Sequence, residues 1–261
     1  MPKLAHPIAG DSLALAQADT EVITVLEHAP LGQEMQENLF ELNVLRHSGT
    51  HVAELAAAGY DVVAPSNFGE ISEMVAATGR NQQTPMMSLN RNDFTRRDAF
   101  WLFLVRDGKP IAGTAARYTD LAGESFDSFL RRTSREQYQR ETDPIVSVAP
   151  PVMERLKGRL IYLGELELHP GHRGKARKLF RFAHVMMGMA ALKWPEFEMM
   201  YAFVPKQHVK LADGYGFTWK VPRAITWADP VPLGRLNDHW LVATSRVDFE
   251  HAWAGTNSMD F

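Results

Sequence analysis

Residues 161–192 constrain the fold most, because a strand-like segment, a glycine-containing turn and a basic helix follow one another there. In residues 161–168, leucines alternate with Glu165 and Glu167, which is the period of a half-buried strand. Residues 169–174 form the turn, since they contain proline and two glycines. Apolar side chains then recur at helical spacing: Leu179, Phe182, Ala183, Met186, Met187 and Ala190.

The turn and the helix start have the properties of a phosphate-binding site. Free amides of a first helical turn point at an anion, and glycines such as Gly171 and Gly174 let the backbone approach it and adopt positive φ. Basic side chains gather there without an acid among them: His172, Arg173, Lys175, Arg177, Lys178 and Arg181. The same pattern also fits a solvated helix start that binds nothing.

At these residues the sequence resembles the GCN5-related N-acetyltransferase (GNAT) superfamily. The acyl-CoA pyrophosphate loop of that family reads Arg/Gln-x-x-Gly-x-Gly/Ala after a strand that ends in an aliphatic residue. Leu168 supplies the aliphatic residue here, and Gly171 stands where the family has Arg or Gln. The resemblance implies that acetyl-CoA or another acyl-CoA is the co-substrate. It implies that the residues binding it are Leu168, Gly171, His172, Arg173, Gly174, Lys175, Ala176 and Arg177.

The N-terminal part predicts one strand and several helices. A β-branched run predicts a strand over residues 21–27. Helical spacing predicts helices over residues 34–46, 50–58 and 67–78, with Ser66 as a candidate N-cap of the last. The apolar positions of the first of these helices are Met35, Leu39, Leu42 and Leu45.

Two strands and an insertion precede the phosphate loop. Residues 100–106 and 110–118 flank Asp107-Gly108, which predicts a β-hairpin. An insertion over about residues 120–158 follows. It contains an amphipathic helix over residues 124–141 and then a loop over 143–153. This helix could cover the acceptor groove or a long acyl tunnel as a lid, or it could pack without touching a ligand.

The C-terminal part predicts a strand over residues 199–204, a helix over 206–213 and a last strand over 240–247. The resemblance extends over about residues 95–247. It implies an α/β (α+β mixed sheet) fold, whose mostly antiparallel central sheet is splayed at the phosphate-loop strand and flanked by helices.

The expected domain organisation has three parts: an N-terminal lead-in over residues 1–20, an acyltransferase domain over 21–250 and a C-terminal tail over 251–261.

Acyl transfer to an amine needs a polarised carbonyl and a base for the amine proton. The resemblance implies that a backbone amide near Leu168 polarises the carbonyl. Glu165 and Glu167 are the candidate bases, because two nearby carboxylates that are partly desolvated raise one pKa towards working pH. Plain solvent-facing alternation explains the same two residues.

A general acid for the leaving thiolate is the weakest element of the pattern. Relatives often carry a Tyr four residues before the Gly of a Gly-Phe pair, and Ala212 stands at that position here. Tyr215 is the candidate catalytic substitute and His208 a second, although each also fits a packing or surface role. A transferase can also work by positioning alone.

Composition excludes several other functions. The net charge of −3 does not suit a general nucleic-acid binder, and the 261 residues contain no cysteine. No apolar run is long enough for a membrane span, and the histidines lack metal-ligand spacing. We therefore expect a cytoplasmic protein without a metal, nucleic-acid partner or membrane span.

The sequence thus predicts an N-acyltransferase that acts on an amine of a small molecule or peptide. The donor is acetyl-CoA or a longer acyl-CoA, and an acyl carrier protein donor and a homodimer stay open. Methionines around residue 187 fit core packing or the lining of an acyl pocket. The alternative is a non-catalytic acyl-CoA-binding or regulatory module, which Gly171 and Ala212 motivate.

Overall fold

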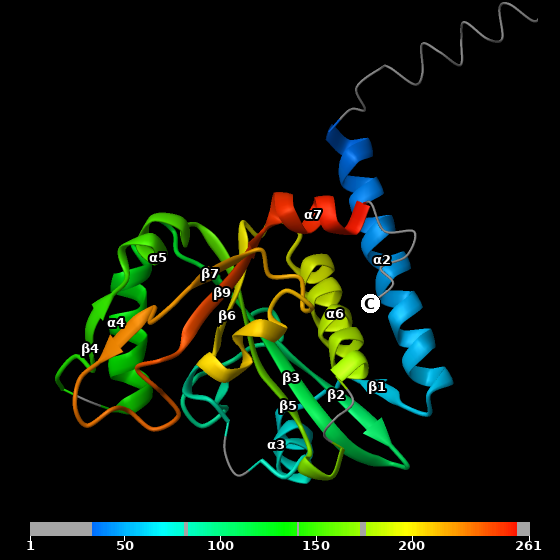
Figure 1. Cartoon of the computed structure of the whole chain (residues 1–261), viewed down its shortest axis with the longest axis horizontal. Coiled ribbons are helices and arrows are strands. Elements are labelled where there is room, and N and C mark those ends of the chain that lie inside the picture. Colours follow the sequence, from blue (N-terminus) through cyan, green and yellow to red (C-terminus); the bar gives the residue numbers. More distant parts are fainter. Residues whose placement is uncertain (1–32, 81–82, 140, 173–175, 255–261) are drawn as a thin grey trace, which may run out of the picture. The chain divides into compact units, whose positions relative to one another are not determined.

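The computed structural model describes residues 33–80, 83–139, 141–172 and 176–254 (Figure 1). The chain divides into two compact units, Met1–Leu39 and Phe40–Phe261. The strand predicted over residues 21–27 lies outside the described residues. The fold and the candidate site both belong to the second unit.

A mixed sheet of seven strands forms the centre of this unit, in the order β1-β2-β3-β5-β6-β9-β7 (Figure 1). Neighbouring strands are antiparallel except β5 and β6, which run parallel. The predicted fold class, a mixed and mostly antiparallel sheet flanked by helices, is confirmed. The strands are β1 (Asp61–Val63), β2 (Ala99–Arg106), β3 (Lys109–Asp120), β5 (Arg159–Leu168), β6 (Met199–Val204), β7 (Trp219–Val221) and β9 (Trp240–Ser245).

Helices cover both faces of the sheet because its strands are apolar on both sides. In β2, Leu102 and Leu104 join one buried cluster, whereas Trp101 and Phe103 join the other. The first cluster is covered by α2 (Gln33–Ala57) from Phe40 onwards, α6 (Ala176–Lys193) and α7 (Arg246–Ala254). The second is covered by α3 (Phe68–Ala77), the 3₁₀ helix η1 (Pro85–Met87), α4 (Phe126–Tyr138) and α5 (Pro150–Arg155).

The hairpin and the central helix are confirmed. Asp107 and Gly108 have φ values of 50° and 73°, the positive values that a two-residue hairpin turn of the type I′ class needs. In α6 the predicted apolar positions are buried except Leu179, which is partly buried, and Phe182 and Ala190 are fully buried. No helix in the described part of the chain has both the length and the apolar character to cross a bilayer.

The prediction of two helices over residues 34–46 and 50–58 is wrong, because α2 is continuous. Gly49 in its middle costs only about 1 kcal/mol relative to Ala, which neighbouring contacts overcome. The predicted apolar face is wrong as well, since Leu42 and Leu45 are 56% and 54% exposed. Phe40 and Val44 are buried against the sheet instead.

Helix α3 begins one residue later than predicted. Its N-cap is Asn67 and not Ser66, because the Asn67 side chain accepts a hydrogen bond from the Glu70 amide at 2.9 Å. Gly79 follows the helix with a φ of 81°, the left-handed conformation that commonly ends a helix.

The insertion is more ordered than the predicted loop over residues 143–153. The strand β4 (Ile145–Val148) pairs with β8 (Ile225–Trp227) in a separate two-stranded sheet, and α5 begins at Pro150. The two strands are about eighty residues apart in the sequence, so no local sequence pattern predicts their pairing.

Two C-terminal boundaries also differ. The helix predicted over residues 206–213 is the 3₁₀ helix η3 (Lys206–Leu211). The last strand ends at Ser245, and α7 continues the chain through part of the predicted C-terminal tail, as far as Ala254.

Helix α4 should be essential for stability because its apolar face is part of the core. Phe126 is 1% exposed and packs edge-on against Tyr201 at 5.3 Å. We expect Phe126→Ala to lower the free energy of unfolding by about 3–5 kcal/mol, measured by urea denaturation. Val146→Ala, at a position that is 60% exposed, should change it by about 0.5 kcal/mol or less. A small effect of Phe126→Ala would show that α4 is a detachable lid.

Candidate functional site

A cleft of about 1500 Å³ passes between β5 and β6. The two strands are paired only from Leu160 to Tyr162 and from Met199 to Tyr201, and both continue beyond that point. Side chains of α6 and η3 line one end of the cleft, and side chains of α3, η1 and α4 line the other. The predicted splay of the sheet is therefore present, and it connects the two faces.

The size of the cleft matters for its use. Sites for a single small ligand usually have volumes of about 300–1,000 Å³. A cleft of about 1500 Å³ that is open towards both faces has room for two ligands that meet between the strands.

The backbone amide of Leu168 faces the cleft. Leu168 lies opposite Ala112 of β3, and the next residue, His169, donates its amide to Ile111 O at 2.7 Å. Successive residues of a strand point their backbone groups to opposite sides, so the Leu168 amide points away from β3. This is the donor that the resemblance implies for a carbonyl oxygen.

Glu165 occupies a β-bulge in β5. Between the paired positions Ala115–Gly164 and Gly113–Glu167, β3 has one residue, Thr114, whereas β5 has two, Glu165 and Leu166. Glu165 has a φ of 63°, which is uncommon for a residue other than glycine and is often found at functional sites. The bulge turns the carboxylate into the cleft, where it is 2% exposed.

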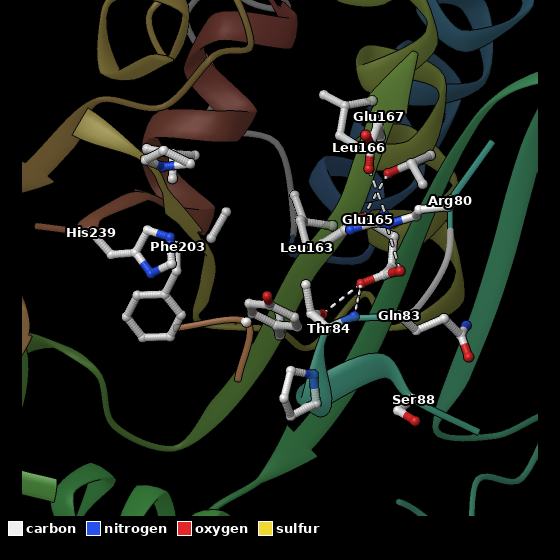
Figure 2. A pocket seen from close by; sticks show the side chains of 18 of the residues that line it. Arg80, Gln83, Thr84, Ser88, Leu163, Glu165, Leu166, Glu167, Phe203 and His239 are labelled. Carbon is white, nitrogen blue, oxygen red and sulfur yellow. Dashed lines mark hydrogen bonds and ion pairs between the residues drawn. The ribbon is translucent and has the colours of Figure 1, made fainter. Parts of the chain in front are cut away.

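Both predicted carboxylates bind one guanidinium, that of Arg80 (Figure 2). Arg80 Nη1 lies 3.0 Å from Glu165 Oε2, and Arg80 Nε lies 3.1 Å from Glu167 Oε2. Thr84 fixes the other oxygen of Glu165, because its amide and its hydroxyl donate to Oε1 at 2.8 and 2.5 Å. Glu167 is 43% exposed, so the two acids differ mainly in burial.

The environment of Glu165 suits proton transfer. Burial raises the pKa of its carboxyl above the usual 4.5, against the opposing effects of Arg80 and Thr84. Oε2 has no hydrogen-bond partner among the described residues, since the approach of Arg80 lacks hydrogen-bond geometry. This buried oxygen of a cleft-lining residue therefore has an unfilled hydrogen-bonding position beside the Arg80 guanidinium.

The predicted phosphate loop is only partly described, because Arg173, Gly174 and Lys175 lie outside the described residues, as does the side chain of Ala176. Gly171 belongs to the 3₁₀ helix η2 (Pro170–His172), and its amide donates to His169 Nδ1 at 3.1 Å. The positive φ expected at Gly171 is absent, because this tight turn uses negative φ.

The basic side chains at the start of α6 have different roles. Lys178 donates to the Tyr60 hydroxyl at 2.9 Å, and Arg181 forms an ion pair with Glu54 at 2.5 Å. Both hold α6 to the neighbouring elements. Arg177 is exposed and has no ion pair among the described residues, so it is available to an anion.

The candidate acids lie at the end of the cleft near α6. Tyr215 lines it, packs edge-on against Phe180 at 5.0 Å, and has its pKa raised to about 12 by burial. At neutral pH it therefore keeps its proton and can donate it. His208 also lines the cleft but is exposed, and Ala212 is buried in the core.

Several site residues were missed in the sequence. Arg80 and Thr84 lie between the helix predicted over residues 67–78 and the strand predicted over 100–106, where no motif marks them, and Arg235 and Tyr138 reach the cleft from segments far from Glu165. The described residues contain no group of His, Cys, Asp or Glu side chains that could hold a metal ion.

Comparisons with known proteins gave matches to solved structures alone. No family model matches the sequence, and no curated protein matches it. FeeM, an N-acyl amino acid synthase from uncultured soil microbes, is 10% identical, with a TM-score of 0.41 over 72% of this chain and 91% of that one. An acetyltransferase from Streptococcus agalactiae is 14% identical, with a TM-score of 0.38 over 72% and 98%.

Naa50 of Arabidopsis thaliana, solved with a bisubstrate analogue, is 12% identical, with a TM-score of 0.37 over 72% of this chain and 99% of that one. These similarities are low and concern the fold alone. What the cleft does must be argued from its own residues.

The buried carboxyl of Glu165 should make stability depend on pH. Because its pKa is raised in the folded state, the folded chain keeps a proton that the unfolded chain has lost. The free energy of unfolding should therefore fall as the pH rises from about 4.5 through the folded-state pKa.

Glu165→Gln should flatten this slope, measured by urea denaturation from about pH 4 to about pH 8. Glu167→Gln, which alters the other partner of Arg80, is the matched control and should keep most of the wild-type slope, because burial is the largest cause of the raised pKa of Glu165 and the charge of Glu167 is a minor one. An unchanged slope in Glu165→Gln would contradict the raised pKa.

Proposed function

We propose that this protein is an N-acyltransferase that moves an acyl group from an acyl-CoA to an amine. The observation that carries the proposal is the buried Glu165 carboxylate in a cleft that connects the two faces of the sheet. The sequence resemblance to GNAT enzymes agrees with it.

The acyl thioester belongs at the α6 end of the cleft. The start of α6 and Arg177 would hold its phosphates, because helix N-termini and arginine favour anions. When bound there, it supplies an activated acyl group whose C–S bond breaks as a C–N bond to the amine forms. The Leu168 amide would donate to the carbonyl oxygen, where negative charge develops.

The amine enters from the α3 and α4 end of the cleft. Glu165 Oε2 accepts a proton from the ammonium form, while Thr84 holds Oε1 and fixes the direction of the carboxylate. Tyr215 or water returns a proton to the departing sulfur. The attacking nitrogen loses its second proton as the amide forms, and this proton replaces the one that Tyr215 or water gives to the sulfur, so that the proton held by Glu165 is the one released overall.

A non-catalytic acyl-CoA-binding module is the second candidate, favoured by Ala212, which leaves the usual position of the general acid without a hydroxyl. A single-turnover assay with radiolabelled acetyl-CoA and a panel of amines separates the two. Transfer of label to any amine establishes the enzyme, and tight binding without transfer establishes the module.

Removal of the proposed base should slow the chemistry selectively. We expect Glu165→Gln to lower kcat by about two to four orders of magnitude, because Gln keeps the shape but cannot take the proton. The acidic limb of the pH–rate profile should disappear, while the Kd for CoA stays unchanged. Glu167→Gln should be mild. A wild-type kcat in Glu165→Gln would exclude this residue as the base.

Arg177 should contribute to CoA binding through phosphate. We expect Arg177→Ala to weaken CoA binding by about tenfold but to leave pantetheine binding unchanged, measured by calorimetry. High salt should reduce the difference, because the charge is exposed. Lys193→Ala, at the other end of α6, is the matched control. An equal loss for pantetheine would place the phosphates elsewhere.

A further inference from the structure

Arg235 is a buried cation in the cleft that has no anionic partner in the described part of the chain. It lies in the loop between β8 and β9, lines the cleft and is 6% exposed. Its Nε donates to the Tyr138 hydroxyl at 3.0 Å, and its guanidinium lies over the rings of Trp227 at 5.3 Å and Phe203 at 5.9 Å. Its two terminal nitrogens have neither a hydrogen bond nor an ion pair among the described residues.

Two other arginines that are partly buried have partners in the protein. Arg131 pairs with Asp127 and Asp143, and Arg117 donates to Met86 O and Asn92 Oδ1. The terminal nitrogens of Arg235 stay accessible from the cleft, although the residue as a whole is buried. A guanidinium with free donors in the wall of a cleft is a suitable site for an anion.

The other charged groups that line the cleft in the described part of the chain do not neutralise Arg235. Glu165 and Glu167 are the carboxylates that line the cleft in the described part of the chain, and both are bound to Arg80. Burial and the nearby Arg235 lower the pKa of His239 to about 4, so this neighbour is neutral at physiological pH. Arg91 lies over the Tyr138 ring at 5.6 Å and adds a second positive charge.

A chain of ring contacts joins this positive end to the strand of the proposed base. The Arg235 guanidinium lies over the Phe203 ring at 5.9 Å, and that ring lies 6.3 Å from the ring of Tyr162. Tyr162 belongs to β5, three residues before Glu165, and Arg235, Phe203, Tyr162 and Glu165 all line the cleft. One small molecule can then present an amine to Glu165 and an anion to Arg235.

We propose that Arg235 binds a carboxylate of the amine acceptor, so that the substrates are α-amino acids or closely related amino carboxylates. A planar guanidinium matches a carboxylate through two parallel hydrogen bonds, and its two terminal nitrogens are free to make them. Tyr138 fixes the guanidinium by accepting from Nε. The substrate class rests on the proposed acyl transfer, whereas the anion site does not.

The test compares matched amines with wild-type protein and three variants. The panel contains each of the common α-amino acids, its carboxamide and its decarboxylated amine, with O-phosphoethanolamine to represent a phosphate. Release of CoA from acetyl-CoA or a longer acyl-CoA gives kcat and KM. The variants are Arg235→Met, Arg235→Lys and the matched control Arg96→Met, whose side chain is exposed and lies outside the cleft.

We expect wild-type protein to prefer one or more amino acids over the matched carboxamide and amine by about 100-fold in kcat/KM. Arg235→Met should abolish this preference, because kcat/KM should fall far more for the amino acid than for its decarboxylated amine, mainly through KM. Arg235→Lys should restore part of it, and Arg96→Met should behave as wild type. Equal use of all three compounds, preference for the phosphate, or an equal loss in Arg235→Met for every amine would overturn the inference and leave acyl transfer intact.

Failure to acylate any amine would reject the proposed function and leave the anion site to a direct measurement. Calorimetry with the same amino acids then decides. Binding that Arg235→Met abolishes and Arg96→Met retains supports the site, and the lack of binding to wild-type protein overturns it.

Discussion

The separation of β5 and β6 beyond Tyr162 and Tyr201 is the constraint on which the candidate site depends. In an ordinary sheet, each strand satisfies the backbone groups of its neighbour along its whole length. Here two central strands keep apolar packing on both faces but lose their common hydrogen bonds. Beyond the paired residues, the facing backbone groups of β5 and β6 border the cleft. A ligand that enters the cleft can make the hydrogen bonds that the two strands do not make with each other.

The position of Glu165 balances two opposing effects. Burial disfavours the charged carboxylate, whereas the Arg80 guanidinium and the Thr84 donors favour it. Because Arg80 also binds the exposed Glu167, its positive charge is divided between two acids. Arg80 therefore holds Glu165 in place, but it lowers the pKa of the Glu165 carboxyl less than a cation paired with Glu165 alone would.

Local sequence patterns predicted the parts of the fold that depend on neighbouring residues. The Asp107-Gly108 turn and the apolar face of α6 were evident, since each is decided within a few positions. The apolar face predicted for α2 was wrong, because its leucines have helical spacing but are exposed. The buried face is the one that carries Phe40, so periodicity alone does not identify it. Glu165 was predicted from the strand pattern. Its partner Thr84, however, is 81 residues away in the sequence, and Tyr138 is 97 residues from its partner Arg235. Such distant contacts leave no local pattern.

The proposed base and the proposed anion site lie on different elements of the chain. Glu165 belongs to a central strand, whereas Tyr138 ends the helix of the insertion and Arg235 lies in a loop packed against it. Substitutions in the insertion and in this loop can therefore change the groups around Arg235 without disturbing the bulge or Arg80. In a chain with this arrangement, recognition of the acceptor can change separately from the chemistry that we propose for the central strand.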